Sequence, residues 1–267
     1  MVDKKLGFKV MLFILINSIL GSSLFYLPSL GVISSGAASI IAWVALFILA
    51  GIMMMYVGEL VSLHPTSGGT YEFCKRAYGR FGSFIAGWSI WIAGNFGMAL
   101  NLVAAAQYFI PEQTTAAFYL QMIFVVMWIV VLNFMAYRGV DAGSIMLVTF
   151  GIIATVVVLL MTIPSFIDFP GLLTGSFGSP FNFSLLEPFF RHAGLEMWSY
   201  IGLSILLISE AVLGFEVVSY MANEYDKPEE LHKVLLWGIG ICGVIMIAYI
   251  FSSLGTVDYV SYVQDAR

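Results

Sequence analysis

Two carboxylates interrupt an apolar run towards the C-terminal end of the chain. Glu210 and Glu216 flank Gly214 in the stretch Ser209–Glu216, inside a segment that is otherwise hydrophobic. An ionisable side chain at membrane depth is costly and usually faces a cavity or a transport pathway. The pattern predicts that both carboxylates line such a cavity. The alternative is a shifted span that leaves one glutamate near the membrane interface.

A second weak point lies near the N-terminus, at Gly21-Ser22-Ser23, followed by Pro28. From Val10 to Gly58 the chain has no Asp, Glu, Lys or Arg. Glycine and serine weaken a helix, and proline removes a backbone donor. A broken membrane helix usually lines a cavity, where its free N–H groups can bind an anionic group. The alternative is a Gly/Ser helix-packing contact with a tolerated proline.

Composition places these stretches in a membrane protein. The 267 residues are 60% hydrophobic and 10% charged, with a mean hydropathy of +0.96. A helical span needs about 20 apolar residues. Seven spans are predicted, at residues 10–34, 39–63, 81–110, 117–137, 143–163, 197–221 and 234–254. The lipid bilayer is thus the expected surroundings. Neither a nucleic-acid partner nor a disulfide between Cys74 and Cys242 is expected.

The positive charges predict the orientation. With a cytoplasmic N-terminus, nine of the eleven Lys and Arg residues fall in inner segments, and only Arg191 and Arg267 fall outside. Cytoplasmic loops of membrane proteins carry such an excess. We therefore expect a multi-pass protein of the plasma membrane with its N-terminus inside.

Three separated motifs resemble those of the amino acid–polyamine–organocation (APC) superfamily, nearest to its basic amino acid and polyamine antiporters. The motifs are Gly21–Pro28; Gly58-Glu59-Leu60 with Pro65–Tyr71 and Tyr78-Gly79; and Gly214-Phe215-Glu216 with Asn223–Pro228. The resemblance implies an all-α integral membrane fold of five-plus-five inverted repeats, with helices 1 and 6 broken. It divides the chain into a first repeat (1–163), an extracellular loop (164–196) and a partial second repeat (197–267).

The resemblance also implies a substrate site between the two broken helices. Backbone around Gly21, Ser22 and Ser23 would bind a substrate carboxylate. Backbone carbonyls of Ile19, Ala211, Val212 and Leu213 would bind the amino group, and Gly214 would belong to the same substrate-binding stretch. Half-helix N-termini favour anions and half-helix C-termini favour cations, in agreement with this assignment.

Three polar side chains complete the expected site. Asn95 lies in the stretch Trp91–Met98, which resembles the part of arginine/agmatine-type antiporters that contacts the substrate side chain. An interhelical hydrogen bond is the alternative for Asn95. Glu216 matches the family's proton-linked acid. Glu210 falls where those antiporters place an aromatic gate, so it is expected to gate, to carry a coupling proton or to attract a cationic substrate.

Secondary active transport of an amino acid by alternating access is the predicted function, driven by proton coupling or by exchange against a counter-substrate. A cationic or polyamine-like substrate is favoured. The seven predicted spans lack the family's helices 8 and 9, so the alternative is a transport-incompetent binding or regulatory piece that needs a partner segment. A seven-helix receptor is disfavoured by the charge bias. No enzymatic motif, catalytic residue, metal site or cofactor is expected.

Overall fold

The computed structural model of the chain describes residues 5–21, 23–66, 68–112, 114–167 and 180–265. Within these ranges the regular secondary structure is helical, apart from a backbone bridge between Leu6 and Tyr225, and loops and turns join the helices. Six described segments are long and apolar enough to cross a membrane, at 26–63, 70–109, 115–137, 143–166, 194–220 and 228–254. The chain is therefore a multi-pass membrane protein.

The first predicted span consists of two half-helices rather than one helix. They are α1 (Phe8–Leu20) and α2 (Ser23–Ser35), of 13 residues each. At that length, they are too short to cross a bilayer singly. A short turn, η1 (Gly36–Ala38), joins α2 to α3 (Ser39–Leu63), which has the predicted bounds. The predicted count of seven spans is consequently not confirmed.

The chain divides into two compact units, and residues 67–147 form the smaller one. It contains α4 (Thr70–Phe109), α5 (Thr115–Tyr137) and the start of α6 (Val140–Phe166). Helix α4 begins before the predicted third span (81–110) and is kinked at Gly79, where φ is +76°. Apolar side chains of α4 and α5 are largely exposed, as in helices surrounded by lipid.

The larger unit comprises residues 1–66 and 148–267. Its C-terminal half holds η2 (Phe183–Leu186), α8 (Gly194–Ile208), η3 (Ser209–Val212), α9 (Glu216–Tyr220), η4 (Ala222–Glu224), η5 (Pro228–Glu230), α10 (Leu231–Leu254) and α11 (Tyr259–Asp265).

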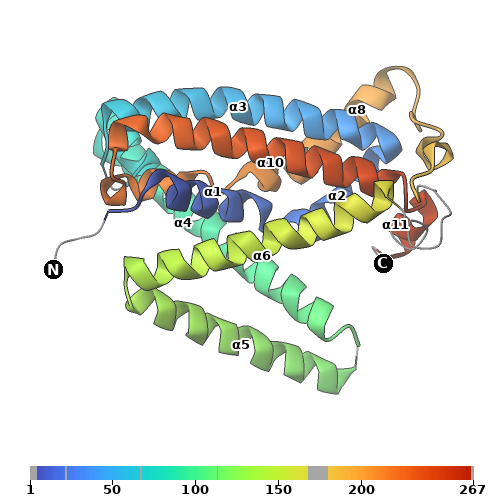
Figure 1. Cartoon of the computed structure of the whole chain (residues 1–267), viewed down its shortest axis with the longest axis horizontal. Coiled ribbons are helices and arrows are strands. Elements are labelled where there is room, and N and C mark those ends of the chain that lie inside the picture. The colour runs from blue at the N-terminus through green and yellow to red at the C-terminus, as the bar shows by residue number, and fades with distance from the viewer. Residues whose placement is uncertain (1–4, 22, 67, 113, 168–179, 266–267) are drawn as a thin grey trace. The chain divides into compact units, whose positions relative to one another are not determined.

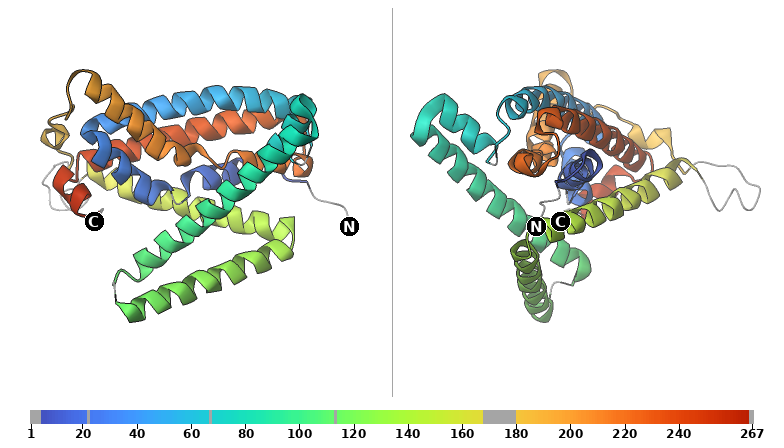
Figure 2. Two further views of the ribbon diagram at one scale, coloured as in Figure 1. Left: turned by 180° about the vertical axis from the view of Figure 1, so that it is seen from behind. Right: turned by 60° about the vertical axis from the view of Figure 1, so that its left-hand side comes forward.

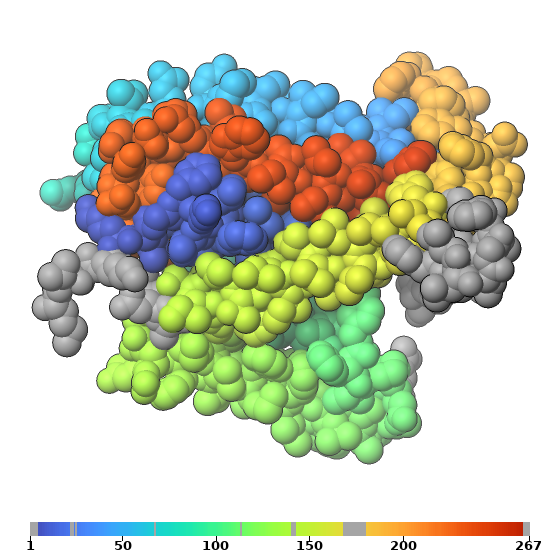
Figure 3. Space-filling view, in the orientation of Figure 1, coloured from blue at the N-terminus to red at the C-terminus, as the bar shows by residue number. Residues whose placement is uncertain are grey.

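The core of this unit pairs helices from the two ends of the sequence. α3 and α10 run side by side (Figure 1), and α2 lies next to α8 (Figure 2). Glycines on α10 allow the close approach, since a Cβ at Gly243 would press on Phe47 and one at Gly238 would collide with Leu15. The space-filling view shows α1 in blue directly against α10 in orange (Figure 3).

This pairing is why the compact units differ from the predicted domains. Residues 1–66 pack with residues from 148 onwards, whereas the repeat division places its boundaries at 163 and 196. Two inverted repeats whose helices interleave are not expected to separate into compact units of their own. The division into repeats therefore stays a prediction.

Candidate functional site

The first break lies where sequence analysis placed it. α1 ends at Leu20, and the Gly21 N–H donates to the Asn17 carbonyl oxygen over 3.0 Å. At Gly21 the backbone leaves the helix, with φ −24° and ψ −129°. α2 begins at Ser23, so its first N–H groups have no partner within their own helix. Ser22 lies outside the described residues.

The second break is longer and has a different geometry. After α8 the backbone tightens into η3, becomes extended at Leu213 (φ −70°, ψ 156°) and turns left-handed at Gly214, where φ is +106°. Only glycine adopts such a φ without a steric penalty. The helix resumes as α9 at Glu216. The predicted interruption between Glu210 and Glu216 is therefore confirmed.

Gly214 brings the two breaks together. A Cβ on Gly214 would lie 2.6 Å from the carbonyl oxygen of Ser18 and 3.0 Å from its carbonyl carbon. The second break thus presses on the backbone of α1, less than one turn before that helix ends. Helix α1 also contacts both η3 and α9. The structure therefore brings the stretch from Ile19 to Gly21 next to that from Ala211 to Gly214.

Glu216 closes the second break from within. One of its carboxylate oxygens, Oε2, accepts a hydrogen bond from the Gly214 N–H over 2.9 Å. As the first residue of α9, Glu216 also places its negative charge at a helix N-terminus, where it is favourable. A hydrogen bond to an ionised acceptor is among the stronger ones in proteins. With its carboxylate bound to the Gly214 N–H, Glu216 stabilises the second break.

Glu210 stands at the other end of the same break and differs in its surroundings. Its side chain is half-buried in η3. The ion pairs Lys75–Glu72 and Lys233–Glu230 do not involve Glu210, and among the described residues no Lys or Arg is shown paired with it. Its polar neighbour is Tyr26 of α2, whose hydroxyl interacts electrostatically with the Glu210 carboxylate.

Two tyrosine hydroxyls near the breaks were missed by sequence reasoning. The Oη atoms of Tyr26 and Tyr220 are buried, and neither has a hydrogen-bond partner among the described residues. Tyr220 interacts with Glu216. Their spacing of four residues places both on one helix face, so the sequence could have indicated that they are neighbours. Tyr26 and Glu210 are far apart in sequence, and nothing in the sequence indicates their proximity.

The remaining predicted site residues are placed as follows. Ala211 and Val212 are buried in η3, whereas the Leu213 side chain is 53% exposed. Ser23 opens α2. Asn95 lies on α4 in the smaller unit, where its side-chain amide donates to the Trp91 carbonyl oxygen over 2.7 Å. The predicted contact of Asn95 with the substrate side chain stays a prediction.

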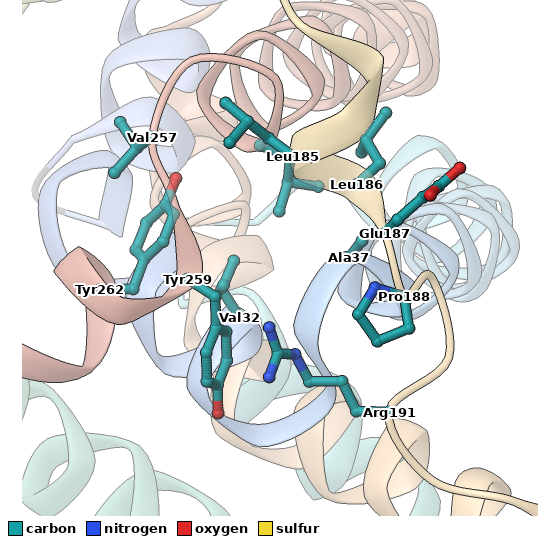
Figure 4. Close-up of a pocket in the computed structure, with 11 residues that line it drawn as sticks. Val32, Ala37, Leu185, Leu186, Glu187, Pro188, Arg191, Val257, Tyr259 and Tyr262 are labelled. Atoms are coloured by element: carbon teal, nitrogen blue, oxygen red, sulfur yellow. The ribbon is translucent and has the colours of Figure 1, made fainter.

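A separate polar junction ties the loop before α8 to α2 and α11. The Arg191 guanidinium lies 3.2 Å from the centre of the Tyr259 ring, and the Tyr259 hydroxyl donates to the Ile33 carbonyl oxygen over 3.2 Å. Figure 4 shows Arg191 turned towards Tyr259, with Glu187 pointing away from it. The cavity beside them measures about 10 Å³. That volume holds at most one water, so this junction is a packing contact and not a ligand site.

Known proteins align with nearly the whole chain. It is 24% identical to an arginine/ornithine antiporter of Lactococcus lactis, ArcD2, over 97% of this chain and 55% of the relative. It is 26% identical to an arginine/agmatine antiporter of Chlamydia felis, over 94% and 51%. An aromatic amino acid transport protein of Corynebacterium glutamicum, AroP, is 25% identical over 85% and 48%.

The chain therefore spans about half the length of the curated relatives it matches. A family model described as amino acid permease matches residues 6–264. Because that match runs through both breaks and covers almost every residue, the chain belongs to the amino acid permease family, within the APC superfamily that its motifs resemble.

Proposed function

We propose that the chain supplies the substrate-binding core of an amino acid transporter that works by alternating access. The observation that carries this proposal is the contact of Gly214 with the Ser18 backbone, because it joins two broken membrane helices at one point. Broken helices in a bilayer are tolerated where they line a cavity, and paired breaks mark the binding site of many transporters.

The charges of an amino acid suit the ends of these half-helices. The start of α2 offers N–H groups, near Gly21, Ser22 and Ser23, to the substrate carboxylate. The backbone carbonyls of Ile19, Ala211, Val212 and Leu213 would accept hydrogen bonds from the ammonium group, next to Gly214. Asn95 is proposed to contact the substrate side chain.

Exchange against a counter-substrate is the proposed driving force, with proton coupling as the second candidate. Relatives named as arginine/ornithine and arginine/agmatine antiporters favour exchange. Two half-buried carboxylates at membrane depth, Glu210 and Glu216, favour a role in proton coupling or gating. The proposed location is the cell membrane with the N-terminus inside, from the distribution of Lys and Arg.

A binding-only role is the second candidate function, because the chain spans about half of its relatives. A further segment would then supply the remaining helices for transport. Uptake of labelled arginine into liposomes that contain only this chain separates the two candidates. Uptake above that of empty liposomes supports transport by the chain itself, and binding without uptake supports the binding-only role.

Ligands that lack one charge test the proposed site without altering the protein. Arginine should stabilise the detergent-solubilised chain against heat, whereas arginine methyl ester and N-acetylarginine should not. The ester removes the carboxylate charge, and the acetyl group removes the ammonium charge. If both derivatives stabilise the chain as well as arginine does, the two breaks are not the binding site for the amino acid backbone.

A further inference from the structure

The Glu210 carboxyl is not needed to complement the backbone charges of an amino acid at the two breaks. The carboxylate and ammonium of an amino acid cancel each other, and the half-helices complement them with partial charges of both signs. Glu216 is already hydrogen-bonded to the Gly214 N–H over 2.9 Å. Glu210 is half-buried, belongs to the same break and faces no described cation. Among the described residues, the Glu210 carboxyl therefore has no cationic partner.

Tyr26 lies near Glu210 and indicates the place that a cationic partner would occupy. Its hydroxyl is buried, has no hydrogen-bond partner among the described residues and lies in electrostatic contact with the Glu210 carboxylate. The Tyr26 hydroxyl can donate its hydrogen to that carboxylate, and its oxygen can still accept a hydrogen bond from a ligand. Tyr26 comes from α2 and Glu210 from η3, and these two elements are in contact. Each broken helix thus contributes one polar side chain to the same place.

From this geometry we infer that Glu210 and Tyr26 form a subsite for the cationic side chain of the substrate. Glu210 binds a guanidinium or ammonium group, and Tyr26 positions the carboxylate. A guanidinium suits this pair best, because its several donors can reach both the carboxylate and the phenolic oxygen. This inference rests on the proposed function, since it assigns the side-chain end of the same substrate.

Arginine and citrulline provide a matched pair of ligands. They have nearly the same shape, but citrulline carries a neutral ureido group in place of the guanidinium. Titration calorimetry of the detergent-solubilised chain should give arginine an affinity at least about tenfold higher, as a charge-assisted hydrogen bond at a buried site provides. Equal affinities would overturn the subsite and leave the proposed function standing. Failure to bind arginine, citrulline or any other amino acid would instead overturn the proposed function.

Variants of Glu210 and Tyr26 then test whether these residues cause the preference for arginine over citrulline. Glu210→Gln should bring the ratio of the two affinities close to one while citrulline still binds, which also shows that the variant is folded. Glu210→Asp should retain a preference for arginine. Tyr26→Phe should weaken arginine severalfold and citrulline less. Glu196→Gln, an exposed acid in the first turn of α8, is the control and should leave both affinities unchanged. An unchanged ratio in Glu210→Gln would return Glu210 to a gating or proton-coupling role.

Discussion

The two breaks interrupt their helices with different backbone geometries. In the first, a single described residue, Gly21, turns out of α1, and no residue described there has a positive φ. In the second, the chain passes through a 3₁₀ turn, an extended residue and a left-handed glycine before Glu216 closes it. The first break is thus a simple stop and restart of the helix, whereas the second is a specific loop that its own residues define.

The supports of the two breaks differ accordingly. A Cβ on Gly151 of α6 would lie 2.9 Å from the Asn17 Cβ and 3.0 Å from the Phe13 carbonyl oxygen. Helix α6 therefore touches α1 at Gly151, just before the first break. The second break is held by contacts of η3 with α1, α2 and α3 and by the hydrogen bond from the Gly214 N–H to Glu216. Both breaks thus have neighbours that support them, and the second has in addition a hydrogen bond between its own residues.

The largest expected effect comes from Gly214→Ala. A left-handed φ costs a non-glycine residue about 1–2 kcal/mol, and overpacking against the Ser18 backbone adds about 1–3 kcal/mol. We expect a marked fall in the thermal unfolding midpoint and loss of amino acid binding. In Gly21→Ala the new Cβ meets the Asn17 carbonyl oxygen at 3.2 Å and no other described atom within 4 Å, so the fall should be smaller. Equal losses in the two variants would remove the proposed difference between the breaks.

A smaller effect is expected when Glu216 is shortened. Glu216→Ala leaves the Gly214 N–H without its acceptor, at a cost of about 1.5–3 kcal/mol for a hydrogen bond to a charged group. Glu216→Gln keeps a side-chain oxygen that can accept the same bond, so most of the stability should remain. Thermal unfolding of both variants measures this difference.

Transport or binding assays of the same two variants sharpen the role of Glu216. If Glu216→Gln is as stable as the unmodified chain but no longer responds to a pH gradient, the carboxylate carries a coupling proton as well. If Gln destabilises as much as Ala does, the charge itself, and not the hydrogen bond, holds the second break in place.

Sequence alone predicts the positions of both breaks, because glycine, serine and charged residues weaken an apolar membrane helix at the place where they occur. It also predicts α3, which is apolar from Ser39 to Leu63 and ends where polar residues begin. Helix α6 was predicted to end at Ile163, yet it continues through Pro164 to Phe166. Proline is tolerated in a membrane helix where neighbouring groups satisfy the freed backbone, and the span pattern carries no information on those neighbours.

The pairing of Tyr26 with Glu210 lies beyond sequence reasoning for a related physical reason. It depends on how α2 packs against η3. Hydropathy identifies the segments that enter the membrane, but not which of them pack against each other. The contact of Gly214 with Ser18 is similar, since a glycine in an apolar span reads equally well as a packing contact or as a turn. The motifs of the family indicated that these segments belong together, whereas composition did not.

The smallest effect is predicted for Gly151→Ala, which tests whether α6 supports the first break. The added methyl group has to displace Asn17 or the Phe13 carbonyl, which costs about 1–2 kcal/mol against a gain in helix propensity of about 0.5–1 kcal/mol. A glycine of the same helix, Gly143, has no described atom within 4 Å of its added Cβ, so Gly143→Ala should show the propensity gain alone. Hydrogen exchange of the α1 amides from Asn17 to Gly21 should accelerate in Gly151→Ala, while exchange around Gly214 stays unchanged. Faster exchange at both breaks would mean that they open as one unit, and would contradict a support by α6 that is local to the first break.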